Sequence, residues 1–125
     1  MSLLSGLMGN ASQVKASEVE SDLGDILVEG ERIDFAYKLI RDFFVFTNKR
    51  MILVDKQGLT GSKSEVKSIP YTSIKAFAKE NPGTFDLDAE LKIWLQGSEI
   101  PITKTFKKDI DLNSIYKTLS GYILH

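Results

Sequence analysis

Three acidic residues that alternate along one segment could bind a metal ion. Asp86, Asp88 and Glu90 are spaced two positions apart. On a β-strand their side chains would share one face, with about 7 Å between successive Cα atoms. Such a row suits a hard cation such as calcium. No loop rich in further oxygen ligands accompanies it, however, and we interpret it as the solvated face of a half-buried strand. We therefore expect no metal ion and no other cofactor.

Residues that could carry catalysis are scarce. The single histidine, His125, is the last residue, where no neighbour is fixed to orient it. The sequence contains no cysteine, which excludes a thiolate nucleophile, a disulfide framework and cysteine-rich zinc sites. It also lacks the glycine patterns of nucleotide-binding loops and a nucleophile elbow. The sequence predicts a protein that is not an enzyme.

Composition sets the size and the class of the protein. The chain has 125 residues, of which 42% are hydrophobic, enough for one core. Sixteen basic and seventeen acidic residues give a formal charge of -1, so no electrostatic attraction toward nucleic acid is expected. No apolar run approaches the ~20 residues of a membrane span, and the start resembles no secretory signal. We expect one cytoplasmic domain, residues 31–125, preceded by an N-terminal arm and helix, residues 1–30.

The segment 41–55 organises the rest of the chain. Two apolar runs, 43–46 and 51–54, are separated by a short polar link. Each run is rich in residues that favour strands, so the pattern predicts an antiparallel hairpin with Asn48 at positive φ in its turn. Neither run alternates cleanly, which indicates that both faces of the hairpin are covered. The core covers one face, and the sequence leaves the cover of the other face open.

Alternating apolar residues predict five further strands. They span residues 33–40, 66–69, 74–78, 84–96 and 99–106. In the segment 84–96 the apolar side chains fall on one face, and Trp94 falls on the opposite face among charged residues. In the segment 99–106 we expect Ile100 and Ile102 to point inward, and Pro70 is expected to mark an edge or a corner.

Helical periodicity occurs near both ends of the chain. Near the start, apolar residues predict a short amphipathic helix from about Ser17 to near Gly30, with Ser17 and Glu20 as a capping box. Its apolar stripe would pack on its own domain or on another subunit, and we favour the former. The last helix is predicted from one apolar face, made of Leu112, Ile115, Tyr116, Leu119 and Ile123. The predicted fold is mainly β with α, a partly open barrel of seven antiparallel strands capped by this C-terminal helix.

Several spaced motifs resemble the first type of bacterial pleckstrin-homology family. They are the run RDFFVFTNKRMILVDKQGLTGSK and the later segments SIPYTSI and GTFDLDAELKIWLQG. One departure is the segment 79–83, Lys-Glu-Asn-Pro-Gly, where the family pattern has Glu-Thr-Ala-Gly. The resemblance implies a helix-capped, pleckstrin-homology-like barrel without a catalytic site. It also implies closed homo-oligomeric rings, with five subunits expected, formed through strand edges.

Two hypotheses for function follow. The first is a binding or scaffolding module whose partner is itself, and then another protein bound by the assembled ring. Aromatic residues concentrate at interfaces, so its candidate contacts are Trp94 and whichever of Phe43 and Phe44 faces away from the core. The second is a peripheral sensor of anionic lipid headgroups or phosphate. The resemblance places Lys38 and Arg41 where such domains carry basic residues, and Lys49 and Arg50 lie beyond them. Arg41, Asp42 and Arg50 would alternatively form local ion pairs.

Overall fold

A computed structural model describes residues 12–38, 43–57, 63–81, 89–106 and 110–124. Its elements follow the order β1 (Ser12–Gln13), α2 (Ala16–Leu23), β2 (Ile33–Lys38), β3 (Phe43–Thr47), β4 (Arg50–Gln57), β5 (Lys63–Pro70), the 3-10 helix η1 (Tyr71–Ser73), β6 (Ile74–Glu80), β7 (Ala89–Leu95), β8 (Ile102–Phe106) and α3 (Leu112–Ile123). Within these residues, no helix is long and apolar enough to cross a membrane.

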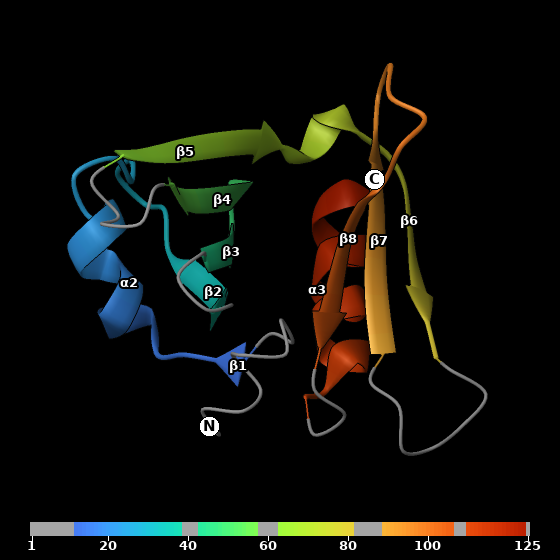
Figure 1. Cartoon of the computed structure of the whole chain (residues 1–125), viewed down its shortest axis with the longest axis horizontal. Coiled ribbons are helices and arrows are strands. Elements are labelled where there is room, and N and C mark those ends of the chain that lie inside the picture. The colour runs from blue at the N-terminus through green and yellow to red at the C-terminus, as the bar shows by residue number, and fades with distance from the viewer. Residues whose placement is uncertain (1–11, 39–42, 58–62, 82–88, 107–109, 125) are drawn as a thin grey trace.

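The strands form two antiparallel sheets. One has five strands in the order β1-β2-β3-β4-β5, and the other has three in the order β6-β7-β8. The chain passes from one sheet to the other through η1, directly after Pro70, which is the corner that the sequence predicted. Figure 1 shows α3 lying between the two sheets. Apart from the two-residue β1, the strand order and the closing helix confirm the predicted fold class.

The main core fills the space between the two sheets and α3. Its aromatic centre is made of rings in close contact: Tyr37 lies against Phe44 and Phe106, with ring centroids 5.3 and 5.0 Å apart, and Phe44 also contacts Phe46. The helix contributes Ile115 and Leu119, which are fully buried. Because aromatic pairs gain stability beyond the area that they bury, this centre holds the two sheets to each other.

A second apolar cluster lies on the opposite face of the five-stranded sheet. Val19 and Leu23 of α2 are fully buried there against residues of β2, β3 and β4: Ala36, Val45, Ile52 and Val54. Figure 1 shows α2 beside these strands, on the side away from α3. This arrangement answers the two questions that the sequence left open, because α2 packs on its own domain and is also the second cover of the hairpin.

Helix α2 departs from its predicted limits. It begins at Ala16, after Lys15, so Ser17 lies inside the first turn and does not cap the helix. It also ends at Leu23, well before Gly30. The close turn there requires Gly24, because a Cβ at this position would lie 2.7 Å from the carbonyl oxygen of Glu20. The positive φ of 82° falls at Gly30, in the turn that leads into β2.

The hairpin has its predicted strands but a different turn. Phe43 to Phe46 pair with Val54 to Met51, as expected from the two apolar runs. Asn48, however, does not adopt positive φ, and no other non-glycine residue described by the structure does. Its side chain instead bridges to the β2 side, since Oδ1 accepts from the Arg32 amide at 2.7 Å and Nδ2 donates to the Gly30 carbonyl at 3.1 Å.

Strands β7 and β8 agree with the predicted alternation except at Ile100. Leu91 and Ile93 of β7 are buried and Trp94 lies on the other face, as the alternation predicted. Residues 84–88 of that predicted strand lie outside the described part. Ile100 was expected to point inward but is 82% exposed, because β8 starts only at Ile102. The intervening residues belong to the turn that Gly97 opens with a φ of 81°.

Helix α3 matches its predicted apolar face. Leu112, Ile115 and Leu119 are buried, and Asp111 caps the N-terminus by accepting a hydrogen bond from the Ser114 amide. This bond and one from the Ser114 hydroxyl lower the pKa of Asp111. A carboxylate at this position also interacts favourably with the helix dipole.

We expect the Leu23→Ala substitution to destabilise the protein by about 2–5 kcal/mol, since it leaves a cavity under α2. Ile26→Ala is the matched control, because Ile26 is 41% exposed and its truncation should cost less than about 1 kcal/mol. Urea denaturation followed by circular dichroism measures both. Equal losses for the two variants would contradict the assignment of α2 as a structural cover.

Candidate functional site

Two of the four basic residues of the predicted anion site, Lys38 and Arg50, lie at opposite ends of β3. Lys38 pairs with Phe43 at the start of β3, whereas Arg50 follows the turn at the other end of this strand. The two ends are about 14 Å apart by strand rise. Lys49 is exposed in the turn, and Arg41 lies outside the described residues. Lys38 and Arg50 therefore do not share one site.

Arg50 is instead the centre of a buried ion pair. Its guanidinium binds the Glu31 carboxylate with both arms, with Nε 2.9 Å from Oε2 and Nη2 3.0 Å from Oε1. The side chain of Glu31 has no exposed surface, and that of Arg50 is 20% exposed. The remaining donors of Arg50 bind the Ile26 carbonyl and the Ser68 hydroxyl, both at 2.8 Å. The Arg50 side chain thus connects the hairpin to the segment that follows α2 and to β5.

Thr47 completes the environment of Glu31. Its hydroxyl donates to Glu31 Oε2 at 2.6 Å and accepts the amides of Lys49 and Arg50, each at 3.0 Å. Burial raises the pKa of Glu31, but the bonds from Arg50, Thr47 and the Val28 amide, together with the charge of Arg50, outweigh it and lower the pKa to about 2. Glu31 is therefore ionised at neutral pH and acts as a structural anion.

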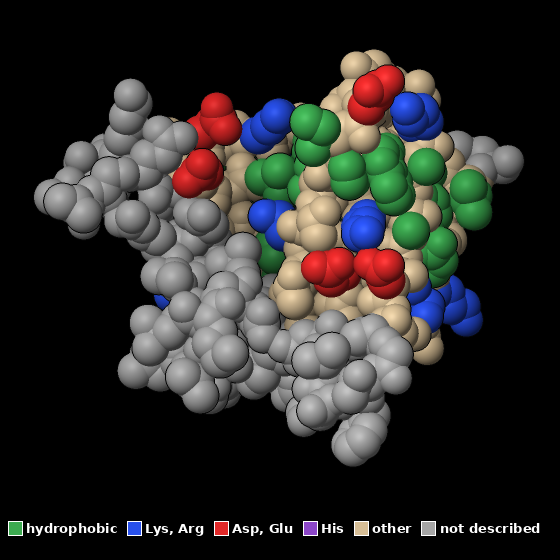
Figure 2. Space-filling model, turned by 45° about the vertical axis from the view of Figure 1, so that its right-hand side comes forward, with side chains coloured by type: hydrophobic (Ala, Val, Ile, Leu, Met, Phe, Trp, Pro, Cys, Tyr) green, Lys and Arg blue, Asp and Glu red, His purple; other side chains and the backbone are tan. Residues whose placement is uncertain are grey.

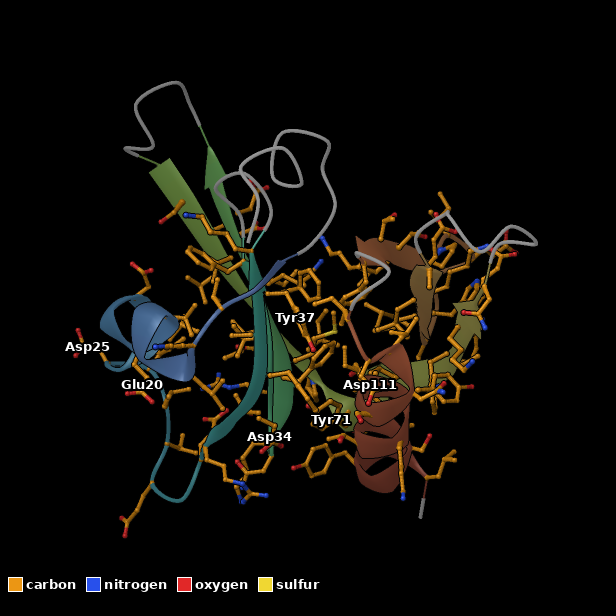
Figure 3. All side chains as sticks on the ribbon, turned by 90° about the horizontal axis from the view of Figure 1, so that it is seen from below. Glu20, Asp25, Asp34, Tyr37, Tyr71 and Asp111 are labelled. Atoms are coloured by element: carbon orange, nitrogen blue, oxygen red, sulfur yellow. The ribbon has the colours of Figure 1, made fainter. Side chains whose placement is uncertain are left out.

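A neighbouring polar contact fixes the end of α3. The Tyr122 hydroxyl donates to Asp34, which also forms an ion pair with Arg32 at 3.2 Å. The ring of Tyr122 stacks on Tyr71 with centroids 5.1 Å apart, and the Tyr71 hydroxyl donates to the Thr47 carbonyl at 2.6 Å. Burial, with a contribution from Tyr122 and nearby carboxylates, raises the pKa of Tyr71. Figure 3 shows Asp34 and Tyr71 on the side of the five-stranded sheet that faces α3.

The aromatic candidates for an interface separate into two environments. Phe44 is fully buried in the main core, so it offers no surface to a second subunit. Phe43 points to the opposite face, where it packs against the cluster under α2 and lies 5.7 Å from Lys38 Nζ. Of the two, Phe43 is therefore the residue that faces away from the main core. Trp94 is half-buried on the second sheet.

Trp94 lies on a surface that we name the β7 outer face. Residues directly opposite each other in antiparallel strands share a face, and the register groups Ala76, Ala78, Glu80, Glu90, Lys92 and Trp94. Figure 2, in which the three-stranded side comes forward, shows hydrophobic side chains around a basic one, with acidic side chains beside it. Lys92 Nζ lies 3.1 Å from Glu80 Oε1, and this contact lowers the pKa of Glu80. The β7 outer face therefore carries the aromatic ring of Trp94 and two alanines beside the Lys92–Glu80 ion pair.

The structure describes only one residue of the acidic row. Glu90 belongs to the β7 outer face, while Asp86 and Asp88 lie outside the described part of the chain. Among the residues that the structure places, no group of three or more histidine, cysteine or acidic residues could hold a metal ion.

Sequence reasoning missed the partner of Arg50. A local ion pair was expected, but Glu31 is 19 positions away in the chain. No periodicity links two residues at this separation, and the contact follows from the pairing of β2 with β3. The Lys92–Glu80 pair was missed for the same reason, because it depends on the β6–β7 register.

Comparisons with known proteins agree with this fold. The family model described as Bacterial PH domain matches residues 2–123. An uncharacterized protein of Bacillus subtilis (strain 168), YjqA, is 53% identical over 122 residues, which cover 97% of this chain and 98% of that protein. A DUF1696 family protein with a pleckstrin-homology domain from Shewanella loihica PV-4 has a TM-score of 0.84 at 48% identity, covering 93% and 99% of the two chains. A pleckstrin homology domain from Shewanella amazonensis SB2B, also 48% identical, has a TM-score of 0.69 and covers 99% and 100%.

The depressed pKa of Glu31 predicts a defined loss of stability in acid. Its pKa of about 2 in the folded protein lies below the ordinary glutamate value of 4.5, so its contribution to stability is complete above pH 4.5 and is lost as the pH falls toward 2. The difference corresponds to about 3 kcal/mol. Urea denaturation at a series of pH values should show this loss in the wild type, whereas the Glu31→Gln protein, less stable at neutral pH, should lack that part of the slope.

Glu29→Gln is the matched control, because Glu29 is exposed in the same turn. This variant should retain the pH dependence of the wild type. An unchanged slope between pH 4.5 and 2 in the Glu31→Gln protein would mean that other carboxylates account for the acid sensitivity.

Proposed function

This chain belongs to the bacterial PH domain family, and on that premise we propose that it is a non-enzymatic binding or scaffolding module. In this proposal several copies assemble into a closed homo-oligomeric ring, with five subunits as the expected number. The ring presents one composite surface to a further protein partner in the cytoplasm. The absence of cysteine from the sequence fits a reducing compartment.

The observation that carries the proposal is the position of Trp94. The ring lies half-buried on the β7 outer face, directly opposite Ala76 and within the same sheet as the Lys92–Glu80 pair. Small neighbours leave the indole accessible to a second surface. A large, partly exposed aromatic ring with charged side chains at its margin is typical of the energetic centre of an interface.

The strand edges support an assembly that closes on itself. The second sheet ends at β6 on one side and at β8 on the other. Unpaired strand edges favour pairing with another chain, and a head-to-tail ring places one edge of each copy against a different edge of the next. The hairpin face gives less support than the sequence suggested, because α2 of the same chain covers it.

A binding function without a chemical step agrees with the inventory of polar groups. The residues in the two polar networks are engaged with one another: Glu31 with Arg50 and Thr47, and Asp34 with Arg32 and Tyr122. Groups committed in this way stabilise a structure. None of these contacts aligns a nucleophile with a base in the geometry that group transfer requires.

We expect the Trp94→Asp substitution to abolish the ring, because it places a charge at the centre of the contact. Light scattering after size exclusion should then give a mass several-fold lower than that of the wild type. Trp94→Phe is the matched control, since it keeps an aromatic ring and should keep the large mass. A wild-type protein that shows no large assembly, or a Trp94→Asp protein that retains it, would contradict the proposal.

The alternative function, a sensor of anionic lipid headgroups or phosphate, has weaker support because Lys38 and Arg50 lie apart. We expect no sedimentation with vesicles of phosphatidylcholine and phosphatidylglycerol beyond that with phosphatidylcholine alone. Salt-sensitive sedimentation that is lost in a Lys38→Glu protein would favour the alternative instead, since electrostatic attachment weakens with ionic strength.

A further inference from the structure

Strand β5 is an edge strand with an unusual degree of exposure. It pairs with β4 on one side and with no other described strand. Its residues 64–68 are all exposed, so neither face of this part of the strand is covered. Figure 1 shows β5 along the upper margin of the molecule, with β4 below it. Every second backbone amide and carbonyl group of such a strand points outward and is available for pairing.

The charges on this edge are arranged symmetrically about Val66. Glu65 precedes this valine and Lys67 follows it, with a serine on either side of the three residues. Within the part of the chain that the structure describes, neither Glu65 nor Lys67 forms an ion pair. Glu65 lies directly opposite Asp55 in the β4–β5 ladder.

We propose that β5 pairs antiparallel with β5 of a second copy of this chain, about a two-fold axis that passes through Val66. In this register Glu65 lies opposite the partner's Lys67, and Lys67 lies opposite the partner's Glu65. The two serines of each strand also face each other. Each Glu65 thereby gains a cation of the second copy, and each Lys67 gains an anion.

The apolar residue of this edge fits the same partner. Val66 is 44% exposed on the side of the sheet where its ladder neighbour Val54 is buried under α2. In the two-fold register it lies against the partner's Val66. Contact between the two valines extends the buried cluster across the axis, and β-branched pairs of this kind stabilise adjacent strands.

The other edges do not share this self-complementarity. Antiparallel pairing of β6 with its own copy about Phe77 sets Lys75 opposite the partner's Lys79, which repels. Pairing of β8 about Lys104 sets this lysine against itself. Strand β1 has two residues. Among the described edges, attraction between unlike charges therefore singles out β5.

The two-fold pair is independent of the proposed ring. It is isologous and closes after two copies, whereas a ring needs head-to-tail contacts. If the ring forms, β5 pairing joins two rings. If it does not, β5 pairing yields a dimer. Loss of the β5 contact halves the mass in either case, so failure of one proposal is distinguishable from failure of the other.

Charge reversal tests the pairing on the full-length protein. The K67E and E65K proteins each place like charges opposite each other twice, and each should show half the mass of the wild type by light scattering at equal protein concentration. Mixing the two proteins should restore the mass, since one copy then carries two acidic and the other two basic side chains. The double variant E65K/K67E should also restore it, because it exchanges the charges of each pair.

K75E is the matched control, because it makes the same charge change on β6 and should leave the mass unchanged. Circular dichroism checks that every variant is folded, which the exposure of these positions favours. The proposal is overturned by single reversals that keep the wild-type mass, by a mixture that fails to regain it, or by a wild type that is monomeric.

Discussion

The buried pair of Glu31 and Arg50 is the interaction on which the arrangement of this fold depends. It is placed where the segment between α2 and β2 meets β4 and β5, and the guanidinium of Arg50 contacts Ile26, Glu31 and Ser68. Removal of either partner leaves a buried charge, which costs far more than loss of a surface ion pair. The turn at residues 47–50 is correspondingly shaped by side chains. Thr47 and Asn48 take over the bonds that a glycine turn would leave to the backbone.

The five-stranded sheet is covered on both faces by segments from opposite ends of the chain. Helix α2 packs on one face and α3, with the second sheet, on the other. This explains why the strands of the central hairpin contain continuous apolar runs, since a sheet with one wet face would alternate. The two surfaces that we propose for contact with other molecules, the β7 outer face and the edge of β5, lie outside this packing.

The fold could be predicted from the sequence where the spacing of apolar residues along a segment shows which of its sides is buried. The alternation around Leu91 and Ile93 and the helical face around Ile115 and Leu119 both reflect one covered side. Ile100 was misplaced because the alternation was extended through a turn, and Asn48 because its side chain bonds to distant residues. The candidate site was less predictable still. Phe43 and Phe44 are adjacent and chemically identical, and which of them is buried depends on the strand register, which the sequence alone did not fix.

The contact between Tyr122 and Asp34 has a consequence for how the protein is made. It joins residues 88 positions apart, and the ring of Tyr122 also stacks on Tyr71 at the corner between the sheets. A chain emerging from the ribosome can pair β2 to β5 and dock α2 early, since these contacts are nearer in sequence. The inner face of that sheet is completely covered only once both the second sheet and α3 have been synthesised. The last turn of this helix therefore completes the cover of that face, through a contact that spans most of the described chain.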